Sequence, residues 1–143
     1  MALISRIVRK HDLALIADEV YREFVYDGEY KSFGTMPELA EHLIMIDSVS
    51  KRYSACGARI GCVMTKNKEL SAQLLKCCQA RLSVSQLDQA GATGLYTTPA
   101  SYWEEVRNEY TRRRDTLKEA LSAMPGVISS EPKGLLCHGQ IAC

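Results

Sequence analysis

The chain has 143 residues, of which 46% are hydrophobic, and carries 18 lysines and arginines against 17 aspartates and glutamates. Its length and apolar content suffice for one ordinary domain with a sizeable core. The near balance of charge gives no electrostatic reason to expect nucleic acid or an anionic membrane as a partner. No apolar run reaches the about 20 residues that a membrane-spanning helix needs.

The first ten residues are basic and contain no acid, a composition also found in organellar presequences. Four apolar residues in this stretch repeat at helical spacing: Leu3, Ile4, Ile7 and Val8. We therefore expect a helix over residues 1–10 that packs on a sheet.

Residues 13–17 form a continuous apolar run, the pattern of a strand buried on both faces. Asp18 and Glu19 follow at its carboxyl end, where open α/β sheets bind their ligands. Residues 24–36 have no clear period and indicate a loop, and residues 37–41 are expected to form one helical turn.

Residues 43–47 are the second predicted strand, and a hydroxyl-rich loop leads from it to a third strand that starts at Ile60. Fewer than ten residues separate Lys51 from Ile60, whereas a parallel crossover needs about a dozen or more, so the third strand should run antiparallel. This return would bring Arg59 beside Lys51. If the first two strands are neighbours, Asp18 and Lys51 could face one ligand.

Two helices should follow. Asn67 can cap the first, whose apolar stripe runs through Leu82 and Leu87 until residues 97–99 break it. The Ser-x-x-Glu pattern that starts at Ser101 predicts a capping box for the second. The apolar stripe of that helix indicates core packing rather than a ligand site, and it consists of Trp103, Val106, Tyr110, Leu117, Leu121 and Met124. A strand over residues 127–129 comes next.

The six cysteines show no Cys-x-x-Cys pair and no histidines at ligand spacing, so we expect no metal site. Adjacent Cys77 and Cys78 are expected to be buried small apolar residues in a reducing, cytoplasmic environment.

The loop over residues 48–61 carries the chemistry. It combines one lysine with hydroxyl residues, two arginines and glycines. Positive charge from Arg52 and Arg59 would favour the uncharged, nucleophilic form of the Lys51 amine. Hydroxyls, a guanidinium and exposed amides suit a phosphate. A reactive lysine beside a phosphate site is what a pyridoxal phosphate enzyme needs.

Two motifs then indicate a family. Ser-x-Ser-Lys at residues 48–51, with Gly57 six and Arg59 eight positions after Lys51, resembles the lysine signature of class I and II aminotransferases of the aspartate aminotransferase superfamily. Asp-Glu-x-Tyr at residues 18–21 resembles a second motif of that family. The resemblance extends from the first helix to Gly134. Because members of the family are far longer, we expect an internal piece of such an enzyme.

The resemblance implies an α/β fold, namely part of the mostly parallel sheet of the fold type I large domain, followed by long helices leading into the small domain. Residues 1–98 would belong to the large domain that binds pyridoxal phosphate. Residues 99–134 would form the linking helix and the start of the small domain.

The resemblance also implies roles for single residues. Lys51 would form the internal Schiff base with pyridoxal phosphate and shuttle a proton in the reaction. Asp18 would pair with the pyridine nitrogen, and Tyr21 would donate to the phenolate oxygen. Glu19 and Arg52 would be scaffold residues. Three residues would hold the phosphate: Ser48, Ser50 and Arg59.

The expected function is amino-group transfer between an aspartate-like amino acid and a 2-oxo acid, with a homodimer for the full-length enzyme. In the family, further cofactor contacts would lie before Met1 and the arginine for the substrate carboxylate after Cys143. A truncated, non-catalytic remnant that binds the cofactor weakly is the alternative, and related lyases and synthases share these motifs. A non-enzymatic α/β binding module would leave the lysine signature unexplained.

The carboxyl terminus departs from the family. Pro132 to Gly134 match its Pro-x-Gly turn, after which Ala-Phe-Tyr and an apolar strand are expected. One choice of synonymous codons for residues 135–143, when it is read one base later, encodes Phe-Tyr-Val-Met-Ala-Lys-Leu-Pro-Val. We therefore expect residues 135–143 to be a frameshifted tail, in which Cys137, His138 and Cys143 carry no designed function.

Overall fold

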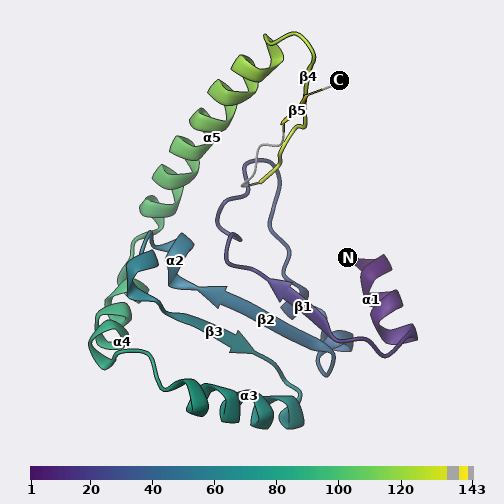
Figure 1. The fold of residues 1–143 in the computed structure, drawn as a ribbon, viewed down its shortest axis with the longest axis vertical. Helices are drawn as coiled ribbons and strands as arrows, with labels where there is room; N and C mark the ends of the chain where they lie inside the picture. Colours follow the sequence, from purple (N-terminus) through teal and green to yellow (C-terminus); the bar gives the residue numbers. More distant parts are fainter. Residues whose placement is uncertain (135–138, 142–143) are drawn as a thin grey trace. The chain divides into compact units, whose positions relative to one another are not determined.

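The computed structural model describes residues 1–134 and 139–141 of the chain (Figure 1). The chain divides into two compact units, one of Met1–Val20 with Lys31–Tyr96 and the other of Tyr21–Tyr30 with Thr97–Cys143. Among the residues that the structure describes, no helix has the length and apolar character needed to cross a membrane.

A three-stranded sheet organises the first unit. Its strands are β1 (Leu15–Asp18), β2 (Leu43–Ser48) and β3 (Gly61–Met64), and β2 lies in the middle. β1 pairs with β2 in parallel, and β2 pairs with β3 antiparallel. The antiparallel pairing confirms the prediction from the short connection, and the parallel pairing meets the condition under which Asp18 and Lys51 were expected at one edge. The predicted burial of the first strand on both faces is wrong, because Ile16 is 63% exposed and only Ala17 of β1 is buried.

A small core covers one side of this sheet. Helix α1 (Ala2–Lys10) confirms the predicted first helix, and its Val8 packs in one buried cluster with Ala17, Leu39 and Leu43. The short 3₁₀ turns η1 (Phe33–Thr35) and η2 (Pro37–Leu39) contribute to the same cluster. The other apolar side chains of the predicted α1 stripe remain exposed, at 59%, 42% and 43% for Leu3, Ile4 and Ile7.

Two helices, not one, follow the sheet. α3 (Lys68–Arg81) is capped as predicted, because the Asn67 carbonyl oxygen accepts the Leu70 N–H at 2.9 Å. The prediction of one continuous helix is wrong, because Leu82 adopts a φ of 69° that a helix cannot accommodate. Ser85 then caps the separate helix α4 (Gln86–Thr93), which the 3₁₀ turn η4 (Gly94–Thr97) extends.

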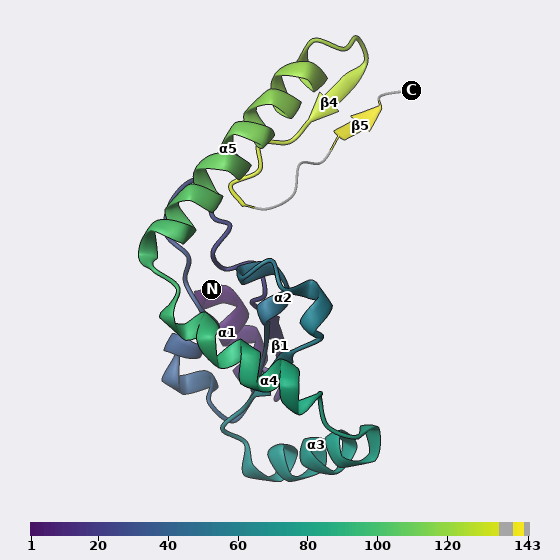
Figure 2. The ribbon, with the colours of Figure 1, turned by 90° about the vertical axis from the view of Figure 1, so that its left-hand side faces the viewer.

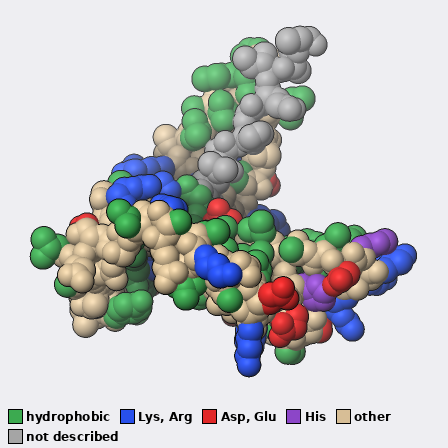
Figure 3. Space-filling model, turned by 60° about the horizontal axis from the view of Figure 1, so that its bottom comes forward, with side chains coloured by type: hydrophobic (Ala, Val, Ile, Leu, Met, Phe, Trp, Pro, Cys, Tyr) green, Lys and Arg blue, Asp and Glu red, His purple; other side chains and the backbone are tan. Residues whose placement is uncertain are grey.

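The predicted burial of these helices is also wrong. Cys77 and Cys78 are exposed free thiols. Leu82 and Leu87 of the predicted stripe are 82% and 85% exposed, because no described element covers that face of α3 or α4. Large hydrophobic side chains therefore remain at the surface of the first unit, and Figure 3 shows them in green on one face.

Helix α5 (Ala100–Ser122) dominates the second unit, and β4 (Val127–Ser129) and β5 (Gly139–Ile141) form an antiparallel pair alongside it (Figure 2). β4 confirms the predicted strand. The predicted capping box is wrong: the helix starts at Ala100 after Pro99, so Ser101 already lies in the first turn. No α5 side chain is fully buried, and Leu117 and Met124 of the stripe expected to pack in a core are 47% and 51% exposed.

The loop over residues 21–30 belongs to this second unit. Its Tyr26 N–H donates to the Lys133 carbonyl at 2.8 Å, and Val25 forms a bridge with Gly134. Phe24 is 5% exposed, and its ring meets the Tyr110 ring edge-on at 5.2 Å. The frameshift expected from residue 135 onward, with Cys137, His138 and Cys143, lies outside the described residues except for the backbone of β5.

Candidate active site

The carboxyl ends of β1 and β2 form one edge of the sheet. Asp18 lies opposite Ile46 in the parallel register, and the Glu19 N–H donates to the Ile46 carbonyl at 2.9 Å. The Asp18 carboxylate is exposed, and one of its oxygens accepts the Val20 N–H at 3.2 Å. Asp18 is therefore an acidic residue at the edge of the sheet where α/β proteins bind their ligands.

Ser48 turns the chain from β2 into the one-turn helix α2 (Val49–Arg52). Its hydroxyl accepts the Ser50 N–H at 3.0 Å and donates to the Ile60 carbonyl at 3.0 Å. The first bond is a helix cap, and the second ties the cap to the chain entering β3. Ser48 and Ser50 are both half-buried.

Lys51 lies in α2, and its side chain is exposed. Ser48 follows Ile46 by two residues, about 7 Å along a strand, and α2 starts directly after it. The parallel pairing thus brings Asp18 and Lys51 to the same edge of the sheet, as expected from the sequence.

Arg59 lies just before Ile60, whose carbonyl accepts the Val49 N–H at 3.2 Å. Its backbone has a φ of 56° and a ψ of 34°, the left-handed conformation that few non-glycine residues adopt. The exposed guanidinium donates to the Cys56 carbonyl at 3.1 Å. The return of the chain into β3 therefore places Arg59 beside the start of α2.

Arg52 does not act as the free positive charge beside Lys51 that the sequence indicated. Its guanidinium donates to the Asp47 carboxylate at 2.6 Å, and the two side chains are only 13% and 10% exposed. The second oxygen of Asp47 accepts the Ser48 N–H at 2.8 Å. Asp47 was not predicted as a site residue, because the sequence does not show on which face of the turn the Arg52 side chain lies.

Glu19 is 2% exposed and accepts a hydrogen bond from the Ser32 hydroxyl at 2.7 Å. Ser32 in turn accepts the Gly34 N–H at 2.9 Å. These bonds tie the end of β1 to the chain that leads into β2. They agree with the scaffold role expected for Glu19.

Tyr21 belongs to the second unit, unlike the other predicted site residues. Its ring meets the Phe24 ring edge-on at 6.0 Å, and Phe24 in turn packs on Tyr110 of α5. The Tyr21 side chain is 38% exposed. Its phenol is therefore held by the aromatic contacts of its own unit.

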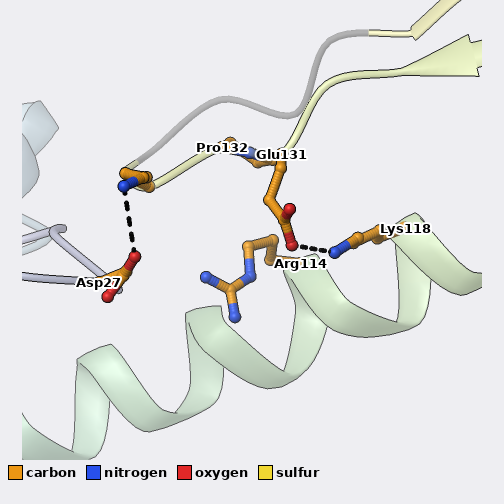
Figure 4. A pocket seen from close by; sticks show the side chains of 6 residues that line it. Asp27, Arg114, Lys118, Glu131 and Pro132 are labelled. Carbon is orange, nitrogen blue, oxygen red and sulfur yellow. Dashed lines mark hydrogen bonds and ion pairs between the residues drawn. The ribbon is translucent and has the colours of Figure 1, made fainter.

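Each unit has a pocket. The pocket of the first unit measures about 280 Å³ and lies between the chain around α2 and the α4–η4 segment, with Asp47, Ser48 and Arg52 in its wall. The pocket of the second unit measures about 450 Å³. Figure 4 shows its two ion pairs, Lys118 with Glu131 and Lys133 with Asp27, on either side of Arg114.

The sequence model of the family "Aminotransferase class I and II" matches residues 2–138. The chain belongs to this family. It is 34% identical to the arginine–pyruvate transaminase AruH of Pseudomonas aeruginosa over 133 residues, which cover 92% of this chain and 33% of that protein. The chain spans about a third of the length of the curated aminotransferases it matches.

Solved aminotransferase structures have the same fold. The aspartate aminotransferase from Rhizobium meliloti gives a TM-score of 0.86 at 26% identity, over 98% of this chain and 36% of that one. The alanine aminotransferase from Pyrococcus furiosus also gives 0.86 at 26% identity, over 98% and 37%. The predicted α/β fold class of the family is confirmed.

Proposed function

We propose that this aminotransferase chain carries the lysine-bearing part of a site for pyridoxal 5'-phosphate. The single observation that supports this most strongly is the placement of Asp18 and of the Lys51-bearing helix α2 at the carboxyl ends of two neighbouring parallel strands. The proposed reaction moves an amino group from an amino acid to a 2-oxo acid. One 2-oxo acid and one amino acid leave, so the exchange is balanced without an external oxidant.

The donor set of this edge fits that cofactor. An exposed carboxylate suits a pyridine nitrogen that must stay protonated, an exposed amine suits an aldehyde carbon, and a guanidinium suits a phosphate. When bound, the cofactor supplies an electron sink for the substrate carbanion. Nothing in this part of the chain offers competing metal ligands, because the described residues contain no cluster of acids, histidines or cysteines that could hold an ion.

Each residue has a proposed task. The Lys51 amine holds the cofactor at its aldehyde carbon and carries a proton to and from the substrate carbon. Asp18 accepts a hydrogen bond from the protonated ring nitrogen, and Tyr21 donates one to the ring oxygen. The phosphate is proposed to bind Ser48, Ser50 and Arg59.

An aspartate-like amino acid is the proposed substrate, in a homodimer of the whole enzyme. The name of the Rhizobium meliloti structure supports aspartate, whereas the names of the other two relatives point to arginine with pyruvate and to alanine. Side-by-side assays with aspartate, arginine and alanine as amino donors test this choice. The four described cysteines are free thiols, which suits a reducing compartment such as the cytoplasm.

One observation favours the alternative of a non-catalytic chain that binds the cofactor weakly. The Ser48 hydroxyl donates its only proton to the Ile60 carbonyl, so it can offer that proton to a phosphate only after rotating. Pyridoxal phosphate-dependent lyases and synthases are a further alternative, and they differ in breaking or forming a bond of the amino acid other than by exchange of its amino group.

The decisive experiment is to titrate the purified chain with pyridoxal phosphate, reduce it with borohydride and map the modified residue. The lysine amine adds to the aldehyde with loss of water, and hydride then fixes the cofactor on the lysine. We expect saturable binding with the label on Lys51, and no such label in Lys51→Arg, which keeps the charge. Label scattered over other lysines, or none at all, would contradict the proposal.

A further inference from the structure

We propose that the buried ion pair of Asp47 and Arg52 is a positioning device for Lys51. This inference rests on the proposed function of Lys51. It goes beyond that function because it assigns a task to two residues that need not touch cofactor or substrate.

The two residues bracket the turn that carries Lys51. Asp47 is the penultimate residue of β2, and Arg52 is the last residue of α2. Their side chains meet at 2.6 Å, and they are only 10% and 13% exposed. The ion pair therefore closes a short loop that contains the residues from Ser48 to Lys51.

The same carboxylate holds both ends of this loop. One oxygen of Asp47 accepts the Ser48 N–H at 2.8 Å at the start of the turn, and the other accepts the guanidinium at its end. A single turn of helix is too short to be stable by itself, so its orientation depends on such outside contacts. Since Lys51 directly precedes Arg52, fixing Arg52 restricts the direction in which the Lys51 side chain leaves the helix.

The chemistry of the pair suits positioning better than stabilisation. Charges lose hydration on burial, so a buried ion pair contributes little net stability compared with apolar side chains of similar volume. An ion pair does fix the orientation of its two side chains. The planar guanidinium of arginine fixes this orientation more tightly than the ammonium of lysine does. An orienting role explains why such a pair lies next to the proposed reactive amine.

The test compares the initial rate of borohydride-trapped labelling of Lys51 by pyridoxal phosphate in the full chain and in three variants. Asp47→Leu with Arg52→Met replaces the pair by apolar side chains of similar size. Arg52→Lys keeps the charge without the planar group. Glu109→Gln breaks the exposed ion pair of Glu109 with Arg113 on α5 and is the matched control.

For the double variant we expect a thermal midpoint close to that of the original chain and a Lys51 labelling rate roughly tenfold lower. That loss lies within the about hundredfold that a displacement of a reacting group by 1 Å can cost. The share of label on other lysines should rise accordingly. Arg52→Lys should show a smaller loss, and Glu109→Gln none.

An unchanged rate at Lys51 in a folded double variant would overturn this inference and leave the proposed function intact. If the double variant does not fold, Arg52→Lys decides in its place, and an unchanged rate there overturns the inference. Failure of the original chain to label at Lys51 is a different result, because it overturns the proposed function itself.

Discussion

The Ser48 hydroxyl and the Ile60 carbonyl are joined by a hydrogen bond of 3.0 Å at the point where β2 ends and the chain returns toward β3. The same hydroxyl caps α2 by accepting the Ser50 N–H. One side chain thus fixes both the start of the turn that carries Lys51 and the segment that follows Arg59.

Replacing Ser48 with alanine should lower the free energy of unfolding by about 1 to 2 kcal/mol, because the variant loses a helix cap and a further hydrogen bond. Chemical denaturation measures this. Ser50→Ala is the matched control, because the backbone N–H of residue 50, which makes the cap bond, is retained. An equal loss in both variants would show that the cap bond is not the source of the effect.

Replacing Asp18 with asparagine should weaken binding of pyridoxal phosphate roughly tenfold or more, because a charge-assisted hydrogen bond contributes about 1.5 to 3 kcal/mol. The thermal midpoint should not change, since the amide oxygen can still accept the Val20 N–H and the side chain is exposed. A cofactor titration followed by absorbance measures the affinity. Asp12→Asn, at a side chain that is 95% exposed, serves as the control, and equal affinities of both variants would remove Asp18 from the proposed site.

Gly61 lies opposite Ser48 in the antiparallel register, and a methyl group there would meet the Asp47 carbonyl at 3.1 Å. Gly61→Ala should therefore separate β3 from the end of β2 and destabilise the chain, by about 1 kcal/mol as for other overpacked sites. Gly57→Ala is the contrasting variant, because nothing lies within 4 Å of the added methyl group. Urea denaturation should show a lower free energy of unfolding for Gly61→Ala and an unchanged one for Gly57→Ala.

The ion pair of Glu131 with Lys118 should make the second unit sensitive to acid. The hydrogen bond from Lys118 lowers the pKa of Glu131 from its ordinary 4.5, with further lowering by the charges of Lys118, Arg114 and Lys133. Because the folded-state pKa is the lower one, the pair stabilises the chain at pH values above 4.5, and this stabilisation is lost as the pH falls through the folded-state value.

Between about pH 7 and about pH 3, the thermal midpoint of Glu131→Gln should accordingly fall by less than that of the original chain. The difference should be small and should shrink at high salt, since the Glu131 side chain is 78% exposed. Glu119→Gln, at an exposed position on α5 of the same unit, is the control. An identical pH profile for Glu131→Gln and the original chain would mean that the pair does not contribute in solution.

The first two strands were predictable because their apolar runs are a strong local signal, although only Ala17 of β1 is buried. The apolar runs at residues 13–17 and 43–47 identified β1 and β2, and the short connection determined the direction of β3. The start of β1 at Leu15 was not predictable, because it depends on a partner far along the chain, the His42 carbonyl that accepts the Leu15 N–H at 2.8 Å.

The helix errors have local causes that periodicity does not register. An apolar stripe continues across Leu82, but the backbone there turns to a positive φ, and Ser85 starts a new helix. At the next helix, the Ser-x-x-Glu pattern predicted a start at Ser101, but the helix begins directly after Pro99, whose fixed φ suits the entry to a helix.

The site was predictable to the level of the sheet edge. Because β1 and β2 are parallel neighbours, their carboxyl ends lie together, and the placement of Asp18 and Lys51 at one edge follows from this topology. The pairing of Arg52 with Asp47 did not follow, because two opposite charges near a lysine can lie on either face of the turn, and only the fold of α2 decides between them.

The second unit is discontinuous in sequence. Its loop of residues 21–30 lies between two segments of the sheet unit, yet it hydrogen-bonds to Lys133 and packs on Tyr110. A truncated chain that starts at residue 97 would leave this loop behind and lose the contact of the Tyr110 ring with Phe24. Proteolytic cleavage after Tyr96 should, for the same reason, yield two polypeptides that remain associated until denaturant is added.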